Sequence, residues 1–573
     1  MSSPGSPPEL SIGIVGSGGD GVVLLGELLA QSAVAAGLYC YMDKVFGPQI
    51  RGGESSAILR ISREEVLRSA DELDVLLVLQ WADLARFSDV LSIAGNALII
   101  CSSEDETSPA DAGLPAGHHG PVLSLPLKQL ALEHGRSKQA RNMVLLGALS
   151  GLLDWYPEQL SAVLERRMQR YDERSRENNL AAVAAGRDAL AGWQEGPLPV
   201  LPTADAAPEL VLASGNELLA RAALASGCRF MAGYPITPAS EILEYMNRRL
   251  PALGGTCIQA EDEIAAACLT LGAGLGGVRS MSATSGPGMT LKSETIALAG
   301  MAGLPLVVVD VQRCGPSTGI PTRTEQADLN LALHGAHGDS PRIVLAAAHQ
   351  ADCAELATQA FELAGRCHAP VILLSEQQLA QGLATLPAGG IPDNTEPSPG
   401  WPERSIGSAV QVQLTGLEHD DKGRPLSDAA SHEANALLRQ ARVDKALGSV
   451  PALQHGALEA ELGLLCWGGS YSVSREALAL AAARGVTAGM LCIRMLSPLD
   501  GDAVQAWLDR QQSLVIVEMN HSGQLHDYLR SRLDLPEITM SLRRSGGRPW
   551  RLAELEEFLV SHGLIPQALE ARS

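Results

Sequence analysis

The distribution of apolar residues along the chain predicts strands and helices in alternation. Short apolar runs suited to buried strands lie at Leu10–Val15, Val75–Leu79, Ala97–Ile100, Leu306–Asp310 and Pro370–Ser375. A helical stretch is expected at Gly26–Ala36. Towards the C-terminal end the expected order is strand, helix, strand, helix, strand, at Leu462–Cys466, Arg475–Ala483, Met490–Ile493, Ala503–Arg510 and Leu514–Glu518. Because alternating strands and helices imply right-handed crossovers, the predicted fold class is multidomain α/β with mostly parallel sheets.

Segments without periodicity divide this pattern. The chain has 573 residues, which is too long for one hydrophobic core. Glu195–Pro208 is rich in proline and predicts a linker, and Pro387–Pro402 predicts a long connection. The expected organisation is an α/β domain over 1–193, a linker over 194–208, a second α/β domain over 209–385, a connecting excursion over 386–432 and a last domain over 433–573.

Composition narrows the class of protein. The formal net charge is -22, which argues against nucleic acid or an anionic membrane surface as a partner. The N-terminal residues lack the pattern of a signal peptide, and no apolar run reaches about 18 residues, so a cytoplasmic protein without a transmembrane helix is expected. The ten cysteines are scattered without a CxxC pair, which favours free buried thiols over an iron–sulfur cluster held by this chain.

A glycine-rich loop follows the first predicted strand. Its sequence GSGGDG places Gly16, Gly18 and Gly21 at the GxGxxG spacing, and Asp43 follows about twenty residues later. This pattern is typical of a dinucleotide site, in which backbone N–H groups approach a pyrophosphate at a helix N-terminus, although a tight turn without a ligand has the same spacing. NAD or FAD is therefore one hypothesis for this loop.

Four further motifs occur in order in the middle of the chain: YPITPAS at Tyr234–Ser240, QAEDEIAAA at Gln259–Ala267, SATSGPG at Ser282–Gly288, and QRCGPSTGIPTRTEQAD at Gln312–Asp328. Thr237 and Pro238 suit the N-cap and first position of a helix, whose N–H groups favour an anion. Carboxylates precede an alanine-rich helical stretch in the second motif. The third motif predicts a sharp turn before a helix from about Met289, and the fourth supplies Arg313 and Arg323, which suit carboxylate recognition.

Taken together, these motifs resemble the alpha subunit of the 2-oxoacid:ferredoxin oxidoreductases, most closely the 2-oxoglutarate enzymes. The resemblance extends to Gly13–Ser62, which is similar to the gamma domain of that family, here fused at the N-terminus. It also extends to CWGGSYS, MLSPLD and EMNHSGQL in the last domain, which is similar to the transketolase C-terminal domain. It implies a thiamine diphosphate pyrimidine-binding domain over 209–385.

The resemblance implies a role for individual residues. Glu263 matches the carboxylate that hydrogen-bonds N1′ of the aminopyrimidine, with Glu261 as the alternative. The implied substrate contacts are Tyr234, Pro235, Ile236, Thr237 and Arg313, with Arg323 reading the distal end of the oxoacid. The implied cofactor contacts are Glu263, Thr284, Ser285, Gly286, Pro287 and Gly288. In the first domain a coenzyme A or phosphate loop is implied at Gly16, Gly18, Gly19, Gly21, Arg51, Gly52 and Gly53.

The implied reaction is oxidative decarboxylation of a 2-oxoacid with coenzyme A, giving acyl-CoA, CO₂ and reduced ferredoxin. It also runs in reverse as CO₂ fixation, as in a reductive TCA cycle. The GDG at Gly19–Gly21 lacks the asparagine that follows it in magnesium–diphosphate half-sites, since the first asparagine is Asn96. The resemblance therefore implies a beta subunit that carries the diphosphate, Mg²⁺ and a [4Fe–4S] cluster, in an (alpha-beta)₂ heterotetramer.

Several alternatives stay open at this point. Pyruvate and branched-chain 2-oxoacids fit the motifs as well as 2-oxoglutarate does. The glycine loop with Asp43 allows an NAD- or FAD-dependent oxidoreductase. A subunit that serves assembly or regulation without catalysis would retain the same loops for structural reasons.

Overall fold

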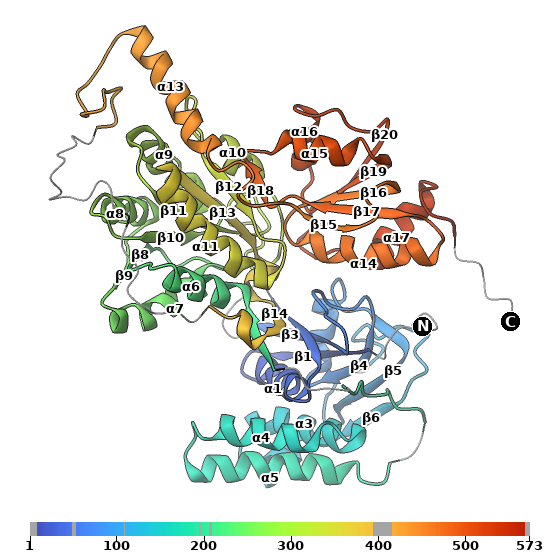
Figure 1. Cartoon of the computed structure of the whole chain (residues 1–573). Helices are drawn as coiled ribbons and strands as arrows, with labels where there is room; N and C mark the ends of the chain where they lie inside the picture. The colour runs from blue at the N-terminus through green and yellow to red at the C-terminus, as the bar shows by residue number, and fades with distance from the viewer. Residues whose placement is uncertain are drawn as a thin grey trace. The chain divides into compact units, whose positions relative to one another are not determined.

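The chain forms two units, each with its own sheets. The computed structural model describes residues 9–47, 53–107, 109–193, 196–204, 209–392, 401 and 415–567. The first unit comprises Met1–Ala213 and Gly382–Gly390, and the second comprises Ser214–Gln381 and Ile391–Ser573 (Figure 1). Within the described part of the chain, no helix combines the length and apolar character needed to cross a bilayer.

The first unit is built on an eight-stranded sheet of order β6-β5-β4-β1-β3-β2-β14-β7. Its strands are β1 Leu10–Ser17, β2 Tyr39–Phe46, β3 Glu54–Ser62, β4 Leu73–Val78, β5 Ile93–Ser102, β6 Val122–Leu125, β7 Leu210–Ser214 and β14 Leu383–Pro387. Strands β1, β4, β5 and β6 are parallel, whereas β3 lies between β1 and β2 and is antiparallel to both. Both ends of the expected 209–385 segment, β7 and β14, therefore add strands to this sheet.

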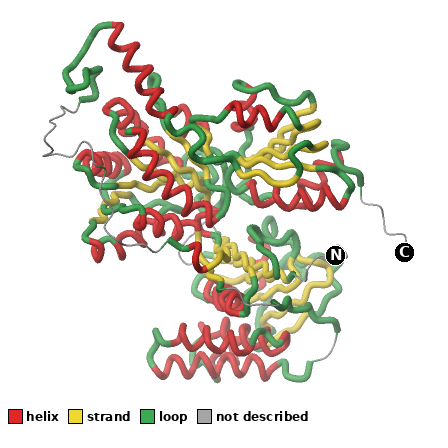
Figure 2. Tube along the Cα trace, viewed as in Figure 1, coloured by secondary structure: helices red, strands yellow, loops and turns green. Residues whose placement is uncertain are grey.

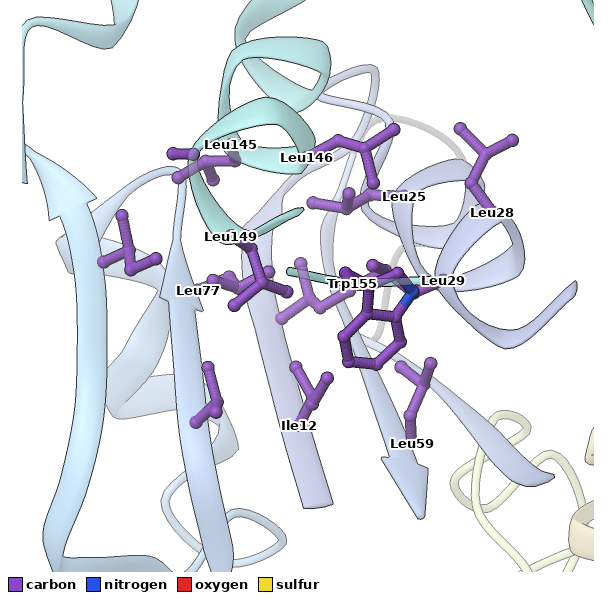
Figure 3. Close-up of a cluster of buried hydrophobic side chains, with 14 of the residues drawn as sticks. Ile12, Leu25, Leu28, Leu29, Leu59, Leu77, Leu145, Leu146, Leu149 and Trp155 are labelled. Atoms are coloured by element: carbon purple, nitrogen blue, oxygen red, sulfur yellow. The ribbon is translucent and has the colours of Figure 1, made fainter. Parts of the chain in front are cut away.

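The core of the first unit lies between this sheet and its helices, which are α1 Val22–Ala35, α2 Leu127–Glu133, α3 Arg141–Leu153, α4 Pro157–Met168 and α5 Glu173–Ala189. Figure 3 shows Trp155 among leucines of α1, α3 and the strands. The Trp155 indole N–H donates to Ser32 Oγ (2.8 Å), so the buried ring retains a polar partner. Helices α3 and α5 approach closely because a Cβ on Gly147 or Gly186 would overlap the backbone of the other helix.

The second unit contains a seven-stranded sheet of order β18-β12-β13-β11-β10-β8-β9. Its strands are β8 Phe230–Gly233, β9 Thr256–Gln259, β10 Ser280–Thr284, β11 Leu306–Gln312, β12 Ile343–Ala346, β13 Pro370–Glu376 and β18 Met495–Ser497. All neighbours are parallel except β18, which pairs antiparallel with β12. The associated helices are α6 Gly215–Ala225, α7 Ser240–Arg249, α8 Glu263–Leu275, α9 Gly286–Ala302, α10 Leu329–His334, α11 Gln350–Cys367 and α12 Gln377–Gln381.

A five-stranded sheet completes the second unit, with order β15-β17-β16-β19-β20. Its strands are β15 Leu453–Gly456, β16 Ala460–Cys466, β17 Ala488–Cys492, β19 Gln511–Glu518 and β20 Ile538–Arg543, with helices α14 Ser470–Ala483, α15 Gly501–Leu508, α16 Gln524–Arg530 and α17 Leu552–Ser561. Helix α13, Ala429–Asp444, precedes this sheet (Figure 1). The two sheets of the unit share one hydrophobic core, in which Ile296 and Leu306 lie with Leu465 and Trp467.

The elements predicted from the apolar pattern are present, and Figure 2 shows their alternation as strands and helices. The α/β class with mostly parallel sheets is confirmed. The first helix starts earlier than expected, at Val22, because Gly21 (φ 77°) ends the loop directly before it. All ten cysteines are free thiols and most are buried, as the composition predicts, although Cys268 is exposed.

Candidate functional site

The four central motifs meet at one edge of the seven-stranded sheet. Strands β9, β8, β10 and β11 are neighbours and parallel, so their carboxyl ends lie together. Each motif begins at or follows the end of one of these strands: YPITPAS follows β8, QAEDEIAAA includes the end of β9, and the other two continue from β10 and β11. Loops at the carboxyl edge of a parallel sheet form the usual ligand crevice of open α/β folds.

Glu263 is the first residue of α8 and is buried, with 8% of its surface exposed, whereas Glu261 is exposed. The Asp262 carboxylate caps the helix by accepting from the Ala265 N–H (2.7 Å). A Cβ on Gly288 would lie 2.7 Å from Glu263 Cγ and 2.9 Å from its Oε1, and would overlap Thr284 Oγ1. Burial and this contact distinguish Glu263 from Glu261, whose side chain is exposed.

Helix α9 begins at Gly286, three residues before the expected start at Met289. Pro287 occupies the first turn, where its missing N–H has no intrahelical acceptor to lose, so the SGPG sequence is helical rather than a separate turn. A Cβ on Gly286 would lie 2.8 Å from Asp328 Oδ2. The two glycines of this turn therefore let carboxylates approach α9 from two sides.

Thr237 is not the N-cap that the sequence predicts. Helix α7 begins at Ser240 after Ala239, and the Thr237–Pro238 peptide bond is cis. The Ser240 N–H donates to the Ile236 carbonyl (3.0 Å), which closes a turn ahead of the helix and moves its start. Thr237 instead presents its carbonyl to Arg313 Nη1 at 2.6 Å, so the first and fourth motifs are in direct contact.

The remainder of the YPITPAS motif borders this contact. Tyr234 (41% exposed) and Pro235 are open to solvent, whereas Ile236 and Thr237 are half-buried. Arg323 is also half-buried in the fourth motif, and its backbone carbonyl accepts from the Cys314 N–H (2.9 Å). The Arg323 side-chain stem packs on Gly547 near the C-terminal end. The structure therefore brings Thr237 and Arg313 together directly and places Arg323 on the adjoining loop.

Arg313 lies in a group of buried charges that the sequence analysis missed. The Asp310 side chain is fully buried, and neither of its oxygens has a hydrogen-bond partner among the described residues. Burial raises the pKa of Asp310 well above its usual range, with the neighbouring Asp328 adding to the effect. Burial also raises the pKa of Asp328 to about 6, the charge of Glu325 adds to this, and Arg313 opposes it.

The balance of these charges constrains what the group can do. The charge of Arg313 acts on both buried carboxylates, so a proton retained by the Asp310–Asp328 pair would lower the negative charge that Arg313 has to balance. Burial likewise lowers the pKa of Arg313, and the two carboxylates oppose that shift. An Asp at the end of the buried apolar strand β11 is a sequence signal that marks such a site, since lone carboxylates are rarely placed in a core.

Lys292 is a second residue that the sequence analysis missed. It lies on α9, one turn after Gly288, and its side chain is fully buried. Its Nζ donates to the backbone carbonyl of Glu263 (3.0 Å). The positions Gly288, Lys292, Thr295, Ile296 and Ala299 form the buried face of the helix, so a lysine on this otherwise uncharged stripe was the available signal.

Several backbone N–H groups of the glycine loop in the first unit already form hydrogen bonds within the protein. The Gly18 N–H donates to the Gly53 carbonyl (2.6 Å), the Asp20 N–H donates to the Ser17 carbonyl (3.0 Å), and the Ser17 N–H donates to Asp20 Oδ2 (3.1 Å). Gly19 and Gly21 line a cavity of about 510 Å³ that also contains Arg136 and Arg167. Gly16 packs against Leu79, which follows β4, and against Val22 of α1, because a Cβ on Gly16 would lie 3.1 Å from each of these side chains.

The topology of this sheet differs from a dinucleotide-binding fold at the position of Asp43. In that fold the second strand lies beside the first and carries the acidic residue towards the loop. Here β3 separates β2 from β1, and Asp43 pairs with Ile58 of β3. The observed strand order therefore removes the structural basis for the NAD or FAD hypothesis. Arg51 and Gly52 lie outside the described residues.

Comparisons with known proteins give two family matches. Residues 221–435 match the model described as "Pyruvate flavodoxin/ferredoxin oxidoreductase, thiamine diP-bdg", and residues 11–189 match "Pyruvate ferredoxin/flavodoxin oxidoreductase". The chain is 32% identical to the 2-oxoglutarate oxidoreductase subunit KorA of Mycobacterium tuberculosis, over 92% of this chain and 88% of that protein. It is 38% identical to the 2-oxoglutarate synthase subunit KorA of Archaeoglobus fulgidus, over 55% of this chain and 90% of that protein.

A solved structure is similar over nearly the whole chain. It is the 2-oxoglutarate:ferredoxin oxidoreductase from Magnetococcus marinus with 2-oxoglutarate, coenzyme A and succinyl-CoA bound. The TM-score is 0.88 and the identity is 30%, covering 97% of this chain and 99% of that one. The similarity includes both units and the sheet edge at which the four motifs meet.

Proposed function

The chain belongs to the 2-oxoacid:ferredoxin oxidoreductases, as an alpha subunit with a fused gamma domain, and on this premise we propose that it acts on 2-oxoglutarate. The enzyme converts 2-oxoglutarate and coenzyme A into succinyl-CoA and CO₂, and two electrons pass to ferredoxin. The observation that carries the catalytic part of the proposal is the buried Glu263 carboxylate, held against Gly288 beside the Thr237–Arg313 contact.

The residues of this site fit thiamine diphosphate. Because Gly288 has no Cβ, the Glu263 and Thr284 side chains can lie close against the first turn of α9. The buried hydroxyls of Ser282 and Ser285 and the Oδ2 atom of Asp328 have no hydrogen-bond partners among the described residues. The cofactor, when bound, supplies the carbanion chemistry that breaks the bond between C1 and C2 of the oxoacid.

Residues of this chain bind and orient the reactants. Glu263 would accept the hydrogen bond of the pyrimidine N1′ position and hold the proton there, with the first turn of α9 packed against its side chain. Thr237 and Arg313 bind the carboxylate at C1 of the oxoacid, and Arg323 binds the distal carboxylate that distinguishes 2-oxoglutarate from pyruvate. Tyr234, Pro235 and Ile236 line the entrance, and Thr284 to Gly288 border the cofactor.

The proposal extends to a complex with further subunits. A KorA protein is by name one subunit of an enzyme, and this chain is one subunit of an oxidoreductase complex. We assign the diphosphate, the Mg²⁺ and the [4Fe–4S] cluster to a beta subunit, in an (alpha-beta)₂ assembly that reduces ferredoxin. Because coenzyme A and ferredoxin are reactants found in the cytoplasm, the proposed location is the cytoplasm. The reverse direction, CO₂ fixation, is part of the proposal as the reversal of the same steps.

Coenzyme A contact is proposed for the first unit. Gly19 and Gly21 border the 510 Å³ cavity, and Arg136 and Arg167 supply positive charge to it. The arginines and glycines of this cavity suit the phosphates of coenzyme A. Replacing both arginines with glutamine should raise the KM for coenzyme A and leave the KM for 2-oxoglutarate unchanged.

The decisive experiment compares two neighbouring carboxylates. The chain is produced anaerobically with its beta subunit, and coenzyme A-dependent reduction of a viologen is measured with 2-oxoglutarate and with pyruvate. We expect Glu263→Gln to lower kcat by about 100-fold or more, because the proton at N1′ loses its carboxylate, while Glu261→Gln serves as the exposed control with wild-type activity. Wild-type turnover by an assembled Glu263→Gln enzyme would refute the proposed catalytic role.

A further inference from the structure

Lys292 is a fully buried lysine that bonds to the backbone of the candidate catalytic residue. Its side chain is inaccessible to solvent, and its Nζ donates to the Glu263 carbonyl at 3.0 Å. Lysine is among the residue types that are rarely buried completely unless they are paired. The carbonyl that it holds belongs to the first residue of α8, the residue whose side chain enters the site.

The surroundings of Lys292 make its positive charge costly. Burial lowers its pKa to about 8, while the charges of Glu263, Asp262 and Cys268 on α8 oppose this shift. Neighbours on the same face of α9 are small or apolar, such as Gly288 and Ile296, so a methionine suits the packing. At this position an uncharged side chain would make the protein more stable than the lysine does. Retention of a charged residue at such a cost is typical of a functional position.

We propose that Lys292 is a positioning residue for Glu263. Its ammonium fixes the backbone carbonyl of Glu263 at the start of α8, and its positive charge acts on the Glu263 carboxylate. Both effects hold the Glu263 side chain as an ionised acceptor directed at a protonated or hydrogen-bonding ring nitrogen of a bound pyrimidine. This inference rests on the proposed role of Glu263 and adds a residue on α9 to the machinery.

Two substitutions separate charge from hydrogen bonding. Lys292→Met removes both, whereas Lys292→Gln removes the charge and retains an N–H donor for the Glu263 carbonyl. Thr295→Val on the same face of α9 is the matched control, since it removes a buried hydroxyl whose partner is Cys268 rather than Glu263. We expect kcat to fall by about 10- to 100-fold in both lysine variants, with little change in the KM for coenzyme A, and to stay near wild type in Thr295→Val.

The pH profile and the thermal stability test the inference without relying on the size of one rate. Because Lys292 loses its proton as the pH rises through about 8, wild-type kcat should fall above pH 8, and this alkaline limb should disappear in Lys292→Met. The folded-state pKa lies below the unfolded value, so the buried charge destabilises the protein below pH 8. Lys292→Met should therefore melt a few degrees higher than wild type at pH 7, and the difference should shrink between pH 8 and 10.5.

Cofactor affinity, measured by calorimetry on the assembled alpha–beta complex, completes the test. We expect weaker binding of thiamine diphosphate to both lysine variants. A lower melting temperature for Lys292→Met with unchanged cofactor affinity would identify a purely structural hydrogen bond and overturn the inference. Wild-type kcat in Lys292→Gln would overturn the charge effect. If Glu263→Gln itself is active, the proposed function fails; if Glu263→Gln is inactive and the lysine variants behave as wild type, the inference about Lys292 fails alone.

Discussion

Gly288→Ala tests the geometry of the site through a single methyl group. An added Cβ would lie 2.7 Å from Glu263 Cγ and would overlap Thr284 Oγ1. Carbon atoms pack without repulsion at about 3.5–4.0 Å, so Glu263 Cγ must withdraw by about 1 Å. A displacement of about 1 Å of a catalytic group costs on the order of 100-fold in rate, and we expect that loss in kcat/KM for 2-oxoglutarate.

Stability should change far less than activity. Overpacking costs about 1–3 kcal/mol, and replacing a helical glycine with alanine returns about 1 kcal/mol, so the free energy of unfolding should fall by at most about 2 kcal/mol. Gly300→Ala on the same helix is the matched control. Its Cβ would lie 3.6 Å from the nearest atom, Ser340 Oγ, which is an ordinary contact. We expect Gly300→Ala to be as active as wild type and up to about 1 kcal/mol more stable.

The assay is coenzyme A-dependent viologen reduction by the assembled alpha–beta complex, together with calorimetric titration of thiamine diphosphate. Gly288→Ala should weaken cofactor binding and lower kcat/KM, whereas thermal denaturation should show an intact fold. If Gly288→Ala retains kcat/KM within about threefold of wild type, the Glu263 side chain is not held where the pyrimidine requires it. Equal losses in Gly288→Ala and Gly300→Ala would point to disturbance of α9 as a whole.

Two further predictions concern the charges around the oxoacid. Asp328→Asn should stabilise the protein by up to about 3 kcal/mol at pH 8, because a carboxyl group whose pKa is raised to about 6 costs stability above that pH. This gain over wild type should vanish as the pH falls from 6 towards 4. Unfolding curves recorded across this pH range measure the difference in free energy of unfolding. Arg323→Ala should raise the KM for 2-oxoglutarate about tenfold or more and leave the KM for pyruvate unchanged, because pyruvate lacks the distal carboxylate; equal increases for both substrates would refute the role of Arg323.

The four motifs could be grouped from the sequence because they follow the ends of parallel strands. The apolar run at Leu306–Asp310 became β11 and fixes where the fourth motif starts, whereas β10, Ser280–Thr284, has no such run and was not predicted. The helix starts were less predictable. Thr237 and Pro238 have the composition of an N-cap and first position, yet the chain turns there and α7 begins at Ser240. Local propensity could not reveal that the Thr237 carbonyl accepts a hydrogen bond from Arg313, which lies 76 residues later in the chain.

Strand order was also beyond the reach of local patterns. The GSGGDG loop and Asp43 satisfy the dinucleotide spacing in sequence, because that spacing records only distance along the chain. Insertion of β3 between β1 and β2 depends on the pairing of Glu54–Ser62 with both strands, which is a long-range property of the sheet. The same residues therefore carry a strong local resemblance to a site that the topology does not build.

The buried charges argue against a subunit that serves only assembly. A structural scaffold gains nothing from the Lys292 bond to Glu263 or from Asp310 in the interior, since apolar residues of similar volume pack there at lower cost. Burial raises the pKa of Asp310 and lowers the pKa of Lys292, so the charged form of each group is less stable in the protein than it would be in water. Lys292 bonds to the backbone of Glu263, and the charge of Arg313, which donates to Thr237, acts on Asp310. Selection for packing alone would scatter or remove these charges, whereas binding and proton transfer at the sheet edge where the four motifs meet require charge in a water-excluded site.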